Sequence, residues 1–203
     1  MNDLYTYATV LTGGIATGKS TVAKMLEKEG FSIIDADKVA HSMLDLHAED
    51  IAMLFGEGIL KEGAIDRKAL GNIVFSDAQA RQKLENFLHP LIREEIESQA
   101  SVFDAHKLPY IIDIPLFFET KSYDIKEIAL VYAPLKIQRE RLMARDGFSK
   151  EQADNRLNAQ ISIELKKAQS SYIIDNSQDM LFLEDEVAQF ITHIRSKYAD
   201  SQV

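Results

Sequence analysis

The feature that most constrains the fold is the run GGIATGKS at residues 13–20. It has the GxxxxGKS form of a Walker A loop, in which glycines allow close backbone approach and successive N–H groups converge on phosphate oxygens. Lys19 would supply a mobile cation, and the Ser20 hydroxyl could bind Mg²⁺. The alternative is a glycine turn that only ends a strand. Because an apolar run precedes the match and a helical pattern follows it, the sequence predicts a phosphate site at a strand-to-helix turn.

Short apolar runs rich in Ile, Val, Leu and Tyr alternate with longer helical patterns along the chain. Near-continuous apolar strands separated by helices indicate a parallel sheet covered on both faces. The five predicted strands cover residues 7–13, 31–37, 110–118, 128–134 and 172–176. The chain therefore has the pattern of an α/β protein.

The helical patterns carry end signals. STVAKMLEKEG is closed by Gly30 and LKIQRERLMARDG by Gly147, while Ser149 and Gln152 match a capping box for the next helix. A final helix is expected from about residue 180 to 197, with an apolar stripe that predicts core packing. The stripe comprises Leu183, Val187, Phe190, Ile191 and Ile194. Residues 39–107 look wholly helical and exceed the single helix that a crossover needs, so we expect a sub-domain there.

Composition excludes several partner classes. A formal net charge of −9 argues against nucleic acid, whose phosphates are bound through excess Lys and Arg. The chain has no cysteine, which excludes disulfides and thiolate zinc sites. The N-terminal segment lacks the features of a signal peptide, and no apolar run approaches the roughly 20 residues of a membrane span. We expect a cytoplasmic protein without a membrane partner.

The remaining sequence narrows the class of nucleotide protein. A GTP-binding switch needs an NKxD segment, and no asparagine in the chain is followed by lysine. A mechanical or regulatory ATPase stays open, although 203 residues leave little room for coupling elements. A small-molecule kinase needs an acceptor pocket, a carboxylate near the acceptor hydroxyl and a cationic lid. The chain offers a candidate for all three.

Candidate carboxylates occur in IIDADKVAH, where Asp35 and Asp37 end the second predicted strand. Ligands of open α/β sheets bind at the carboxyl ends of strands. One aspartate could act as general base on an acceptor hydroxyl while the other orients Mg²⁺-bound water. The alternative is that Asp37 only caps a helix beginning near Lys38.

The candidate lid is LKIQRERLMARDG. Gln138, Arg141 and Arg145 fall on one helical face, with Arg139 displaced from it. Two arginines one turn apart can clamp transferring phosphate oxygens. A solvated charged face, with Glu140 as an intrahelical partner, is an equal alternative.

Taken together, the segments resemble the dephospho-CoA kinase family over nearly the whole chain. The resemblance runs from LTGGIATGKSTVA through IIDADKVAH, GAIDRKALGNIVF, LHPLI, DIPLFFE and QRERLMARDGFSKEQADNRLNAQ to YIIDNS. It implies ATP as donor, Mg²⁺, and the ribose 3′-hydroxyl of dephospho-CoA as acceptor. Alternatives are a kinase of another small acceptor and a non-catalytic ATP-binding module.

The resemblance also implies the organisation of the chain. The expected fold is a five-stranded parallel sheet flanked by helices, of the P-loop NTPase, nucleoside monophosphate kinase-like class. One P-loop kinase domain would cover residues 1–203, with a helical substrate-binding sub-domain inserted at about 39–107 and a lid at about 138–165. We expect a monomer or a weak homo-oligomer.

Site roles are assigned position by position. Catalytic roles fall on Lys19, Asp35, Asp37 and Arg145. Nucleotide contacts are expected at Gly13, Gly14, Ile15, Ala16, Thr17, Gly18, Lys19, Ser20, Thr21, Arg141 and Asn176, the last near the adenine. Acceptor contacts are expected at Asp37, His41, His89, Pro115, Leu116 and Glu119. Mg²⁺ is expected at Ser20 and, through water, at Asp35, with Asp113 as a further candidate that resembles a Walker B carboxylate.

Four residues depart from the family pattern. Ala16 stands where a third glycine is usual, which constrains the loop. His41 replaces a common arginine just after the aspartate pair. Ser170 and Ser171 occupy positions usually filled by Ala-Asp before the last strand.

Overall fold

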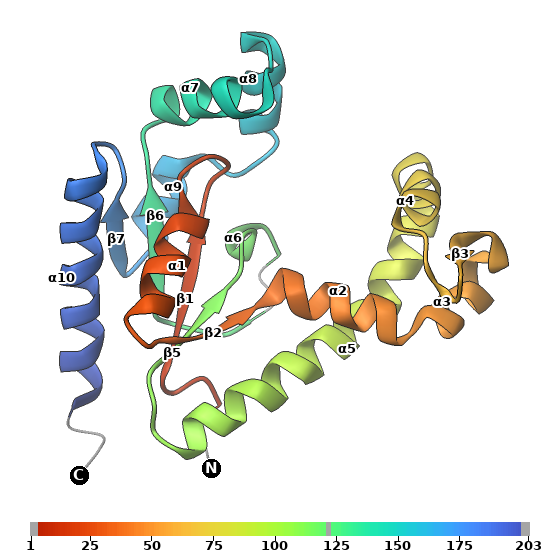
Figure 1. Cartoon of the computed structure of the whole chain (residues 1–203), viewed down its shortest axis with the longest axis horizontal. Coiled ribbons are helices and arrows are strands. Elements are labelled where there is room, and N and C mark those ends of the chain that lie inside the picture. Colours follow the sequence, from red (N-terminus) through yellow and green to blue (C-terminus); the bar gives the residue numbers. More distant parts are fainter. Residues whose placement is uncertain (1–3, 121–122, 200–203) are drawn as a thin grey trace. The chain divides into compact units, whose positions relative to one another are not determined.

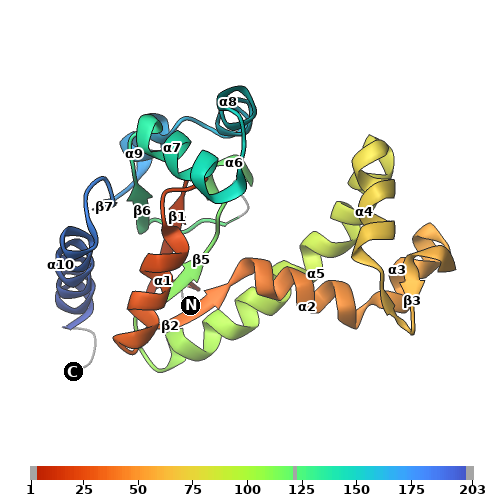
Figure 2. The same ribbon diagram turned by 45° about the horizontal axis from the view of Figure 1, so that its top comes forward.

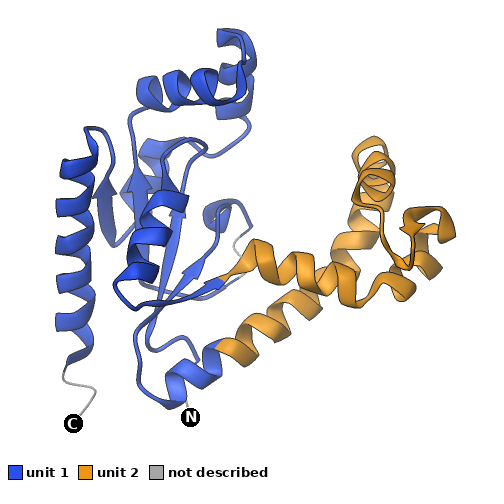
Figure 3. Cartoon of the chain, in the orientation of Figure 1, with its two compact units in different colours: residues 1–34, 100–203 blue, residues 35–99 orange. Residues whose placement is uncertain are grey.

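A computed structural model describes residues 4–120 and 123–199 of the chain. It divides into two compact units, one of residues 1–34 with 100–203 and one of residues 35–99 (Figure 3). Because the smaller unit interrupts the larger one in sequence, it is an insertion. Its bounds overlap the sub-domain expected at 39–107.

The larger unit is built on a five-stranded sheet with the strand order β2-β5-β1-β6-β7 (Figure 1). The strands are β1 (Ala8–Gly13), β2 (Ser32–Asp35), β5 (Tyr110–Asp113), β6 (Ile128–Tyr132) and β7 (Tyr172–Asp175). β1 pairs in parallel with both β5 and β6, and β6 pairs in parallel with β7. The predicted parallel sheet is confirmed, and its central strand leads into the phosphate loop.

The third predicted strand is shorter than expected. β5 ends at Asp113 rather than at residue 118, and the segment Phe117–Thr120 forms the short helix α6. Pro115 has no N–H to donate to a sheet ladder, which favours the end of the strand before it. Both phenylalanines of α6 are buried, so the apolar run in the sequence extends past the end of the strand into the helix.

Helices of the larger unit begin and end close to the predicted signals. They are α1 (Lys19–Lys28), α7 (Leu135–Asp146), α8 (Lys150–Asn158) and α10 (Met180–Tyr198). The helix α9 (Ile163–Gln169) was not predicted. Gly147 ends α7 with φ 68°, and the capping box of Ser149 and Gln152 is present at the start of α8. The sequence signals for these helix ends are confirmed.

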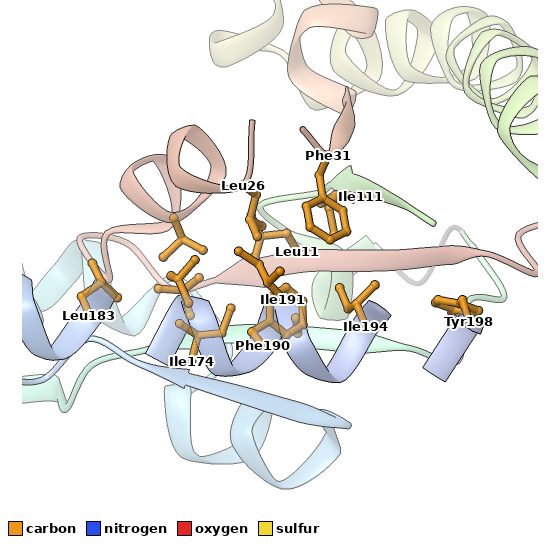
Figure 4. Packing of buried hydrophobic residues seen from close by; sticks show 14 residues of the cluster. Leu11, Leu26, Phe31, Ile111, Ile174, Leu183, Phe190, Ile191, Ile194 and Tyr198 are labelled. Carbon is orange, nitrogen blue, oxygen red and sulfur yellow. The ribbon is translucent and has the colours of Figure 1, made fainter. Parts of the chain in front are cut away.

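Two helices pack on the sheet through one apolar core. α1 and α10 lie beside each other in both views (Figures 1 and 2), and α10 also contacts β7. The core joins their side chains to Leu11, Ile111 and Ile174 of the strands (Figure 4). All five residues of the predicted apolar stripe of α10 are buried, so that prediction is confirmed. All six residues of β1 are buried, so the strand that carries the loop is held within the core.

The smaller unit has its own core and is not wholly helical. Its helices are α2 (Ala36–Leu46), α3 (Ala48–Phe55), the 3₁₀ helix η1 (Glu57–Ile59), α4 (Arg67–Ser76) and most of α5 (Ala78–Ala105). Between η1 and α4 a hairpin pairs β3 (Leu60–Lys61) with β4 (Ala64–Ile65). Both residues of its turn, Glu62 and Gly63, have positive φ, as a tight two-residue hairpin requires. Strands of two residues are too short to show an alternating pattern in sequence.

Through the described ranges, no helix has both the length and the apolar character needed to cross a membrane.

Candidate functional site

The Walker loop is closed by its own hydrogen bonds between β1 and α1. The N–H and hydroxyl of Thr17 donate to the Gly14 carbonyl, at 3.3 and 2.9 Å, and the Thr21 N–H donates to the Gly18 carbonyl at 2.9 Å. Thr17 is fully buried. Its side chain therefore shapes the turn from inside.

A cavity of about 500 Å³ lies over the loop. This is within the volume range of small-molecule sites. It unites most of the loop with three segments far from it in sequence, and all of its lining belongs to the larger unit. The lining residues are Gly13, Gly14, Ile15, Ala16, Gly18, Lys19, Ser20, Pro115, Arg141, Arg145 and Gln160. Of the expected contacts in this unit, Thr17, Thr21, Leu116, Glu119 and Asn176 do not line it.

Lys19 is paired with the carboxylate that resembles Walker B. Its Nζ donates to Asp113 Oδ1, and the two side chains are 19% and 9% exposed. Asp113 ends β5, next to β1 in the sheet, so the parallel topology brings it to the loop. The pair places an oxygen ligand of the kind Mg²⁺ prefers beside the lysine that would contact phosphate.

Both the backbone conformation and the neighbouring side chain at position 18 require a glycine. It has φ 92° at the start of α1, and a Cβ there would lie 2.2 Å from Asn176 Nδ2. That Nδ2 donates to the Thr17 carbonyl at 2.8 Å. Asn176, expected near the adenine, is buried behind the loop and holds the turn in place.

Ala16 occupies a backbone region that favours glycine. Its φ is 59°, which costs a residue with a Cβ roughly 1–2 kcal/mol. The departure from glycine noted in the sequence therefore places a strained residue at the tip of the loop. Such strain persists where the surrounding structure fixes the backbone.

Two arginines of α7 face the loop across the cavity. Arg141 and Arg145 both line it, and one guanidinium nitrogen of Arg141 is buried without a hydrogen-bond partner in the described chain. A buried unpartnered donor on a cavity wall fits an anionic ligand. With Lys19, these side chains give the cavity a positive lining.

Other polar residues of α7 have internal partners. Gln138 is buried, donates to the Ala133 carbonyl at 2.7 Å and lies against Gly14. Arg139 pairs with Asp154 of α8. Arg145 pairs with its neighbour Asp146, at 2.8 Å; hydrogen bonding between them raises the pKa of Arg145 and lowers that of Asp146.

Glu119 is engaged inside the protein. Its Oε1 lies 2.7 Å from Lys166 Nζ and accepts from the Ile161 N–H at 3.1 Å. Lys166 also donates to the Gly13 carbonyl at 3.1 Å. These contacts connect the expected acceptor residue to the phosphate loop through a lysine.

The two aspartates of IIDADKVAH occupy different elements. Asp35 ends β2 and caps α2, accepting from the Lys38 N–H at 3.0 Å, whereas Asp37 lies in the first turn of α2. The alternative that Asp37 caps the helix is wrong, because β2 ends two residues earlier than predicted and α2 begins at Ala36. His41 in α2 and His89 in α5 are exposed residues of the smaller unit.

Two residues at the loop were not identified from the sequence. Gln160 lines the cavity and accepts from the Ile15 N–H at 2.9 Å, and Lys166 is fully buried. The available signal for Lys166 was its spacing of three from buried Ile163, which places a charge on the inward face of α9. Gln160 lies between helices, where periodicity gives no signal.

Comparisons with known proteins agree on one family. A family model described as dephospho-CoA kinase matches residues 7–181. Proteins named dephospho-CoA kinase from Sulfurimonas denitrificans and Wolinella succinogenes are 44% and 47% identical. The matches cover 98% and 95% of this chain and 99% and 96% of theirs. The solved dephospho-CoA kinase from Campylobacter jejuni is 36% identical, with a TM-score of 0.79 over 94% of this chain and 98% of that one.

Proposed function

The chain belongs to the dephospho-CoA kinase family, and from that premise we propose that it transfers the γ-phosphoryl group of ATP to the ribose 3′-hydroxyl of dephospho-CoA. The products are coenzyme A and ADP. The observation that carries the proposal is the cavity in which the Walker loop, with its Lys19, faces Arg141 and Arg145. Phosphoryl transfer depends mainly on positioning and charge stabilisation, and this lining supplies both.

The loop and its cations would handle the donor. Backbone N–H groups between Gly14 and Ser20 would hold the phosphates at the positive end of α1, apart from those of Ile15 and Thr17, which donate to Gln160 and to the Gly14 carbonyl. Lys19 would leave Asp113 in part to contact the β and γ phosphates, while Arg141 and Arg145 would stabilise the transferring group from α7. Three cationic groups then face the region where negative charge spreads in the transition state.

The residues present also fit a magnesium ion. Ser20, which carries a hydroxyl, lines the cavity, and the Asp113 carboxylate is paired with Lys19 of the same lining, so hard oxygen ligands are available. When bound, Mg²⁺ neutralises charge on the phosphates. Asp35 would act on it through water. Sites of this kind use one or two carboxylates together with substrate phosphates, so the chain need not provide a larger cluster.

Acceptor chemistry is assigned to the start of the smaller unit. Asp37 would accept the proton of the ribose 3′-hydroxyl, and Asp35 would orient water bound to the metal. His41, His89, Pro115, Leu116 and Glu119 would contact the acceptor. Pro115 is supported by its place on the cavity wall.

The experiment is an acceptor screen with the purified full chain, ATP and Mg²⁺. Dephospho-CoA, adenosine, AMP, gluconate and shikimate are offered separately, and both ADP and the phosphorylated product are measured. We expect turnover with dephospho-CoA alone. Phosphorylation of another acceptor in its place would make the chain a different small-molecule kinase, and ATP binding without any transfer would make it a binding module.

The Lys19→Ala variant, purified in the same way, is the control for contaminating kinases. We expect it to fold and to lose about 10²-fold or more in turnover, because it lacks a cation that stabilises the developing charge. Wild-type turnover in this folded variant would contradict the role assigned to the loop.

A further inference from the structure

Lys166 is a buried cation behind the phosphate loop. Its side chain is 0% exposed, and it is the one buried Lys or Arg among residues 4–120 and 123–199. It donates to the Gly13 carbonyl at 3.1 Å and lies 2.7 Å from Glu119 Oε1. The lysine therefore connects α9 to α6 and to the last residue of β1.

Stability alone does not explain this pair. Removing two charges from water carries a desolvation penalty, and well-packed apolar residues of similar size often stabilise a fold equally well. Ile163 packs on the inward face of the same helix without a charge. The distinctive property of the lysine is its donation to a backbone carbonyl at the entrance of the loop.

Holding that carbonyl fixes the first peptide of the loop. In a planar trans peptide, the C=O of Gly13 and the N–H of Gly14 point in opposite directions. A carbonyl that is held on Lys166 therefore also fixes the direction of the Gly14 N–H. That N–H is the first of the groups expected to converge on phosphate.

The segment before Lys166 holds the loop at further points. Glu119 Oε1 accepts from the Ile161 N–H, and the adjacent Gln160 accepts from the Ile15 N–H. Ile15 and Ala16 also pack against a small apolar cluster of α7 and α8. These contacts surround Ala16, whose positive φ needs a fixed neighbourhood.

We infer that Lys166 is a positioning residue of the phosphate loop. With Glu119 it holds the Gly13 carbonyl so that the loop presents its N–H groups to a nucleoside triphosphate in one arrangement. The inference rests on the proposed use of the loop for ATP. It does not depend on the identity of the acceptor.

The experiment measures ATP binding by calorimetry without any acceptor, so the acceptor role proposed for Glu119 does not enter. Lys166→Met leaves Glu119, whose side chain is 20% exposed, without its cation and is expected to lower the melting temperature. Lys166→Met/Glu119→Gln removes both charges at nearly constant size and is expected to fold. It still lacks the donor to Gly13, so we expect a Kd for ATP about tenfold higher than in the wild type.

Lys167→Met is the matched control. Lys167 is the next residue of α9, is exposed and has its cation over the Tyr132 ring, so ATP affinity should not change. Wild-type ATP affinity in the folded double variant would overturn the inference. Failure of the double variant to fold would also overturn it, because the pair would then support the whole unit. A wild type that binds ATP but leaves dephospho-CoA unchanged contradicts only the proposed function.

Discussion

The phosphate loop and the smaller unit are held in opposite ways. Hydrogen bonds to the loop come from Asp113, Gln160, Lys166 and Asn176, at separations of 94 to 159 residues. The smaller unit is held by an apolar core drawn from its own residues, between positions 48 and 88. One region is thus fixed by polar contacts from distant segments, the other by local packing.

Because the two regions are held differently, substitutions in them should affect different properties, nucleotide binding in one and folding stability in the other. A small unit buries a smaller share of its surface than a large one, and this unit leaves Met53 and Phe75 79% and 89% exposed. Changes to exposed side chains at the loop cavity, such as Arg145, should therefore alter nucleotide handling with little effect on folding. Changes in the core of the smaller unit should alter folding and leave the donor cavity intact.

The largest effect is expected from Arg145→Ala. An arginine on the transferring phosphate can be worth about 10³-fold in turnover. Its side chain is 61% exposed, so the free energy of unfolding should change by less than about 1 kcal/mol. Steady-state kinetics and urea unfolding measure the two quantities. Lys136→Ala, at an exposed site on the same helix, is the control. Equal turnover in both variants would mean that Arg145 is only a solvated surface residue without a catalytic role.

Asp37→Asn should lower turnover by about 10²-fold at saturating Mg²⁺ without changing ATP affinity, because a general base contributes about that much. Asp35→Asn should instead recover in part as Mg²⁺ is raised. Asparagine is a good N-cap, so this second change leaves the cap of α2 in place. Kinetics across a Mg²⁺ titration compare the variants. Normal turnover in Asp37→Asn would place the base elsewhere, and identical Mg²⁺ responses would make the aspartates one metal-ordering pair.

Ile51→Ala tests the packing of the smaller unit. Ile51 is 0% exposed, so its truncation should cost about 2–5 kcal/mol in the free energy of unfolding. Met53→Ala, two residues along the same helix and largely exposed, should stay within about 0.5 kcal/mol of wild type. Urea unfolding gives both values. ATP affinity of the folded proteins should be unchanged, and a loss in Ile51→Ala would show that the two regions are not independent.

The smallest effect is expected from Ala16→Gly. Glycine removes the free-energy cost of the positive φ, and this gain is larger than the cost of the extra conformational entropy that glycine loses on folding. The net result is a stabilisation of about 0.5 kcal/mol. Ala144→Gly, at an exposed position inside α7, should destabilise by about 1 kcal/mol because glycine is poor in helices. Thermal unfolding distinguishes the opposite signs. A destabilised Ala16→Gly would mean that the lost methyl contacts outweigh the backbone strain.

The sequence predicted those parts of the fold that depend on local patterns. Apolar runs located all five strands of the sheet, and the stripe from Leu183 to Ile194 identified the inward face of α10. The Walker loop was recognisable because its glycines, lysine and serine all fall within one short stretch, residues 13–20. The β3–β4 hairpin was missed because two-residue strands carry no period.

Polar contacts between residues far apart in the chain could not be predicted from local sequence patterns. Sequence spacing does not show that Lys166 reaches Gly13, or that Gln160 reaches Ile15, because those contacts depend on how the elements pack. The alternative that Asp37 caps the helix was wrong by two residues, an ordinary error at a strand-to-helix boundary. The roles of Asp35, Asp37, His41 and His89 toward an acceptor stay predictions.

The hydrogen bond from Asn176 to the Thr17 carbonyl has a consequence for the order of folding. It joins residues 159 positions apart, so the amino-terminal motif cannot reach its final form until the last strand of the sheet has been added. Contacts of such separation close late, because the entropy of the intervening chain opposes them. During synthesis, the glycine-rich turn would therefore be exposed long before it could bind a phosphate group. Competence to bind ATP would arrive in one late step, when β7 joins the sheet.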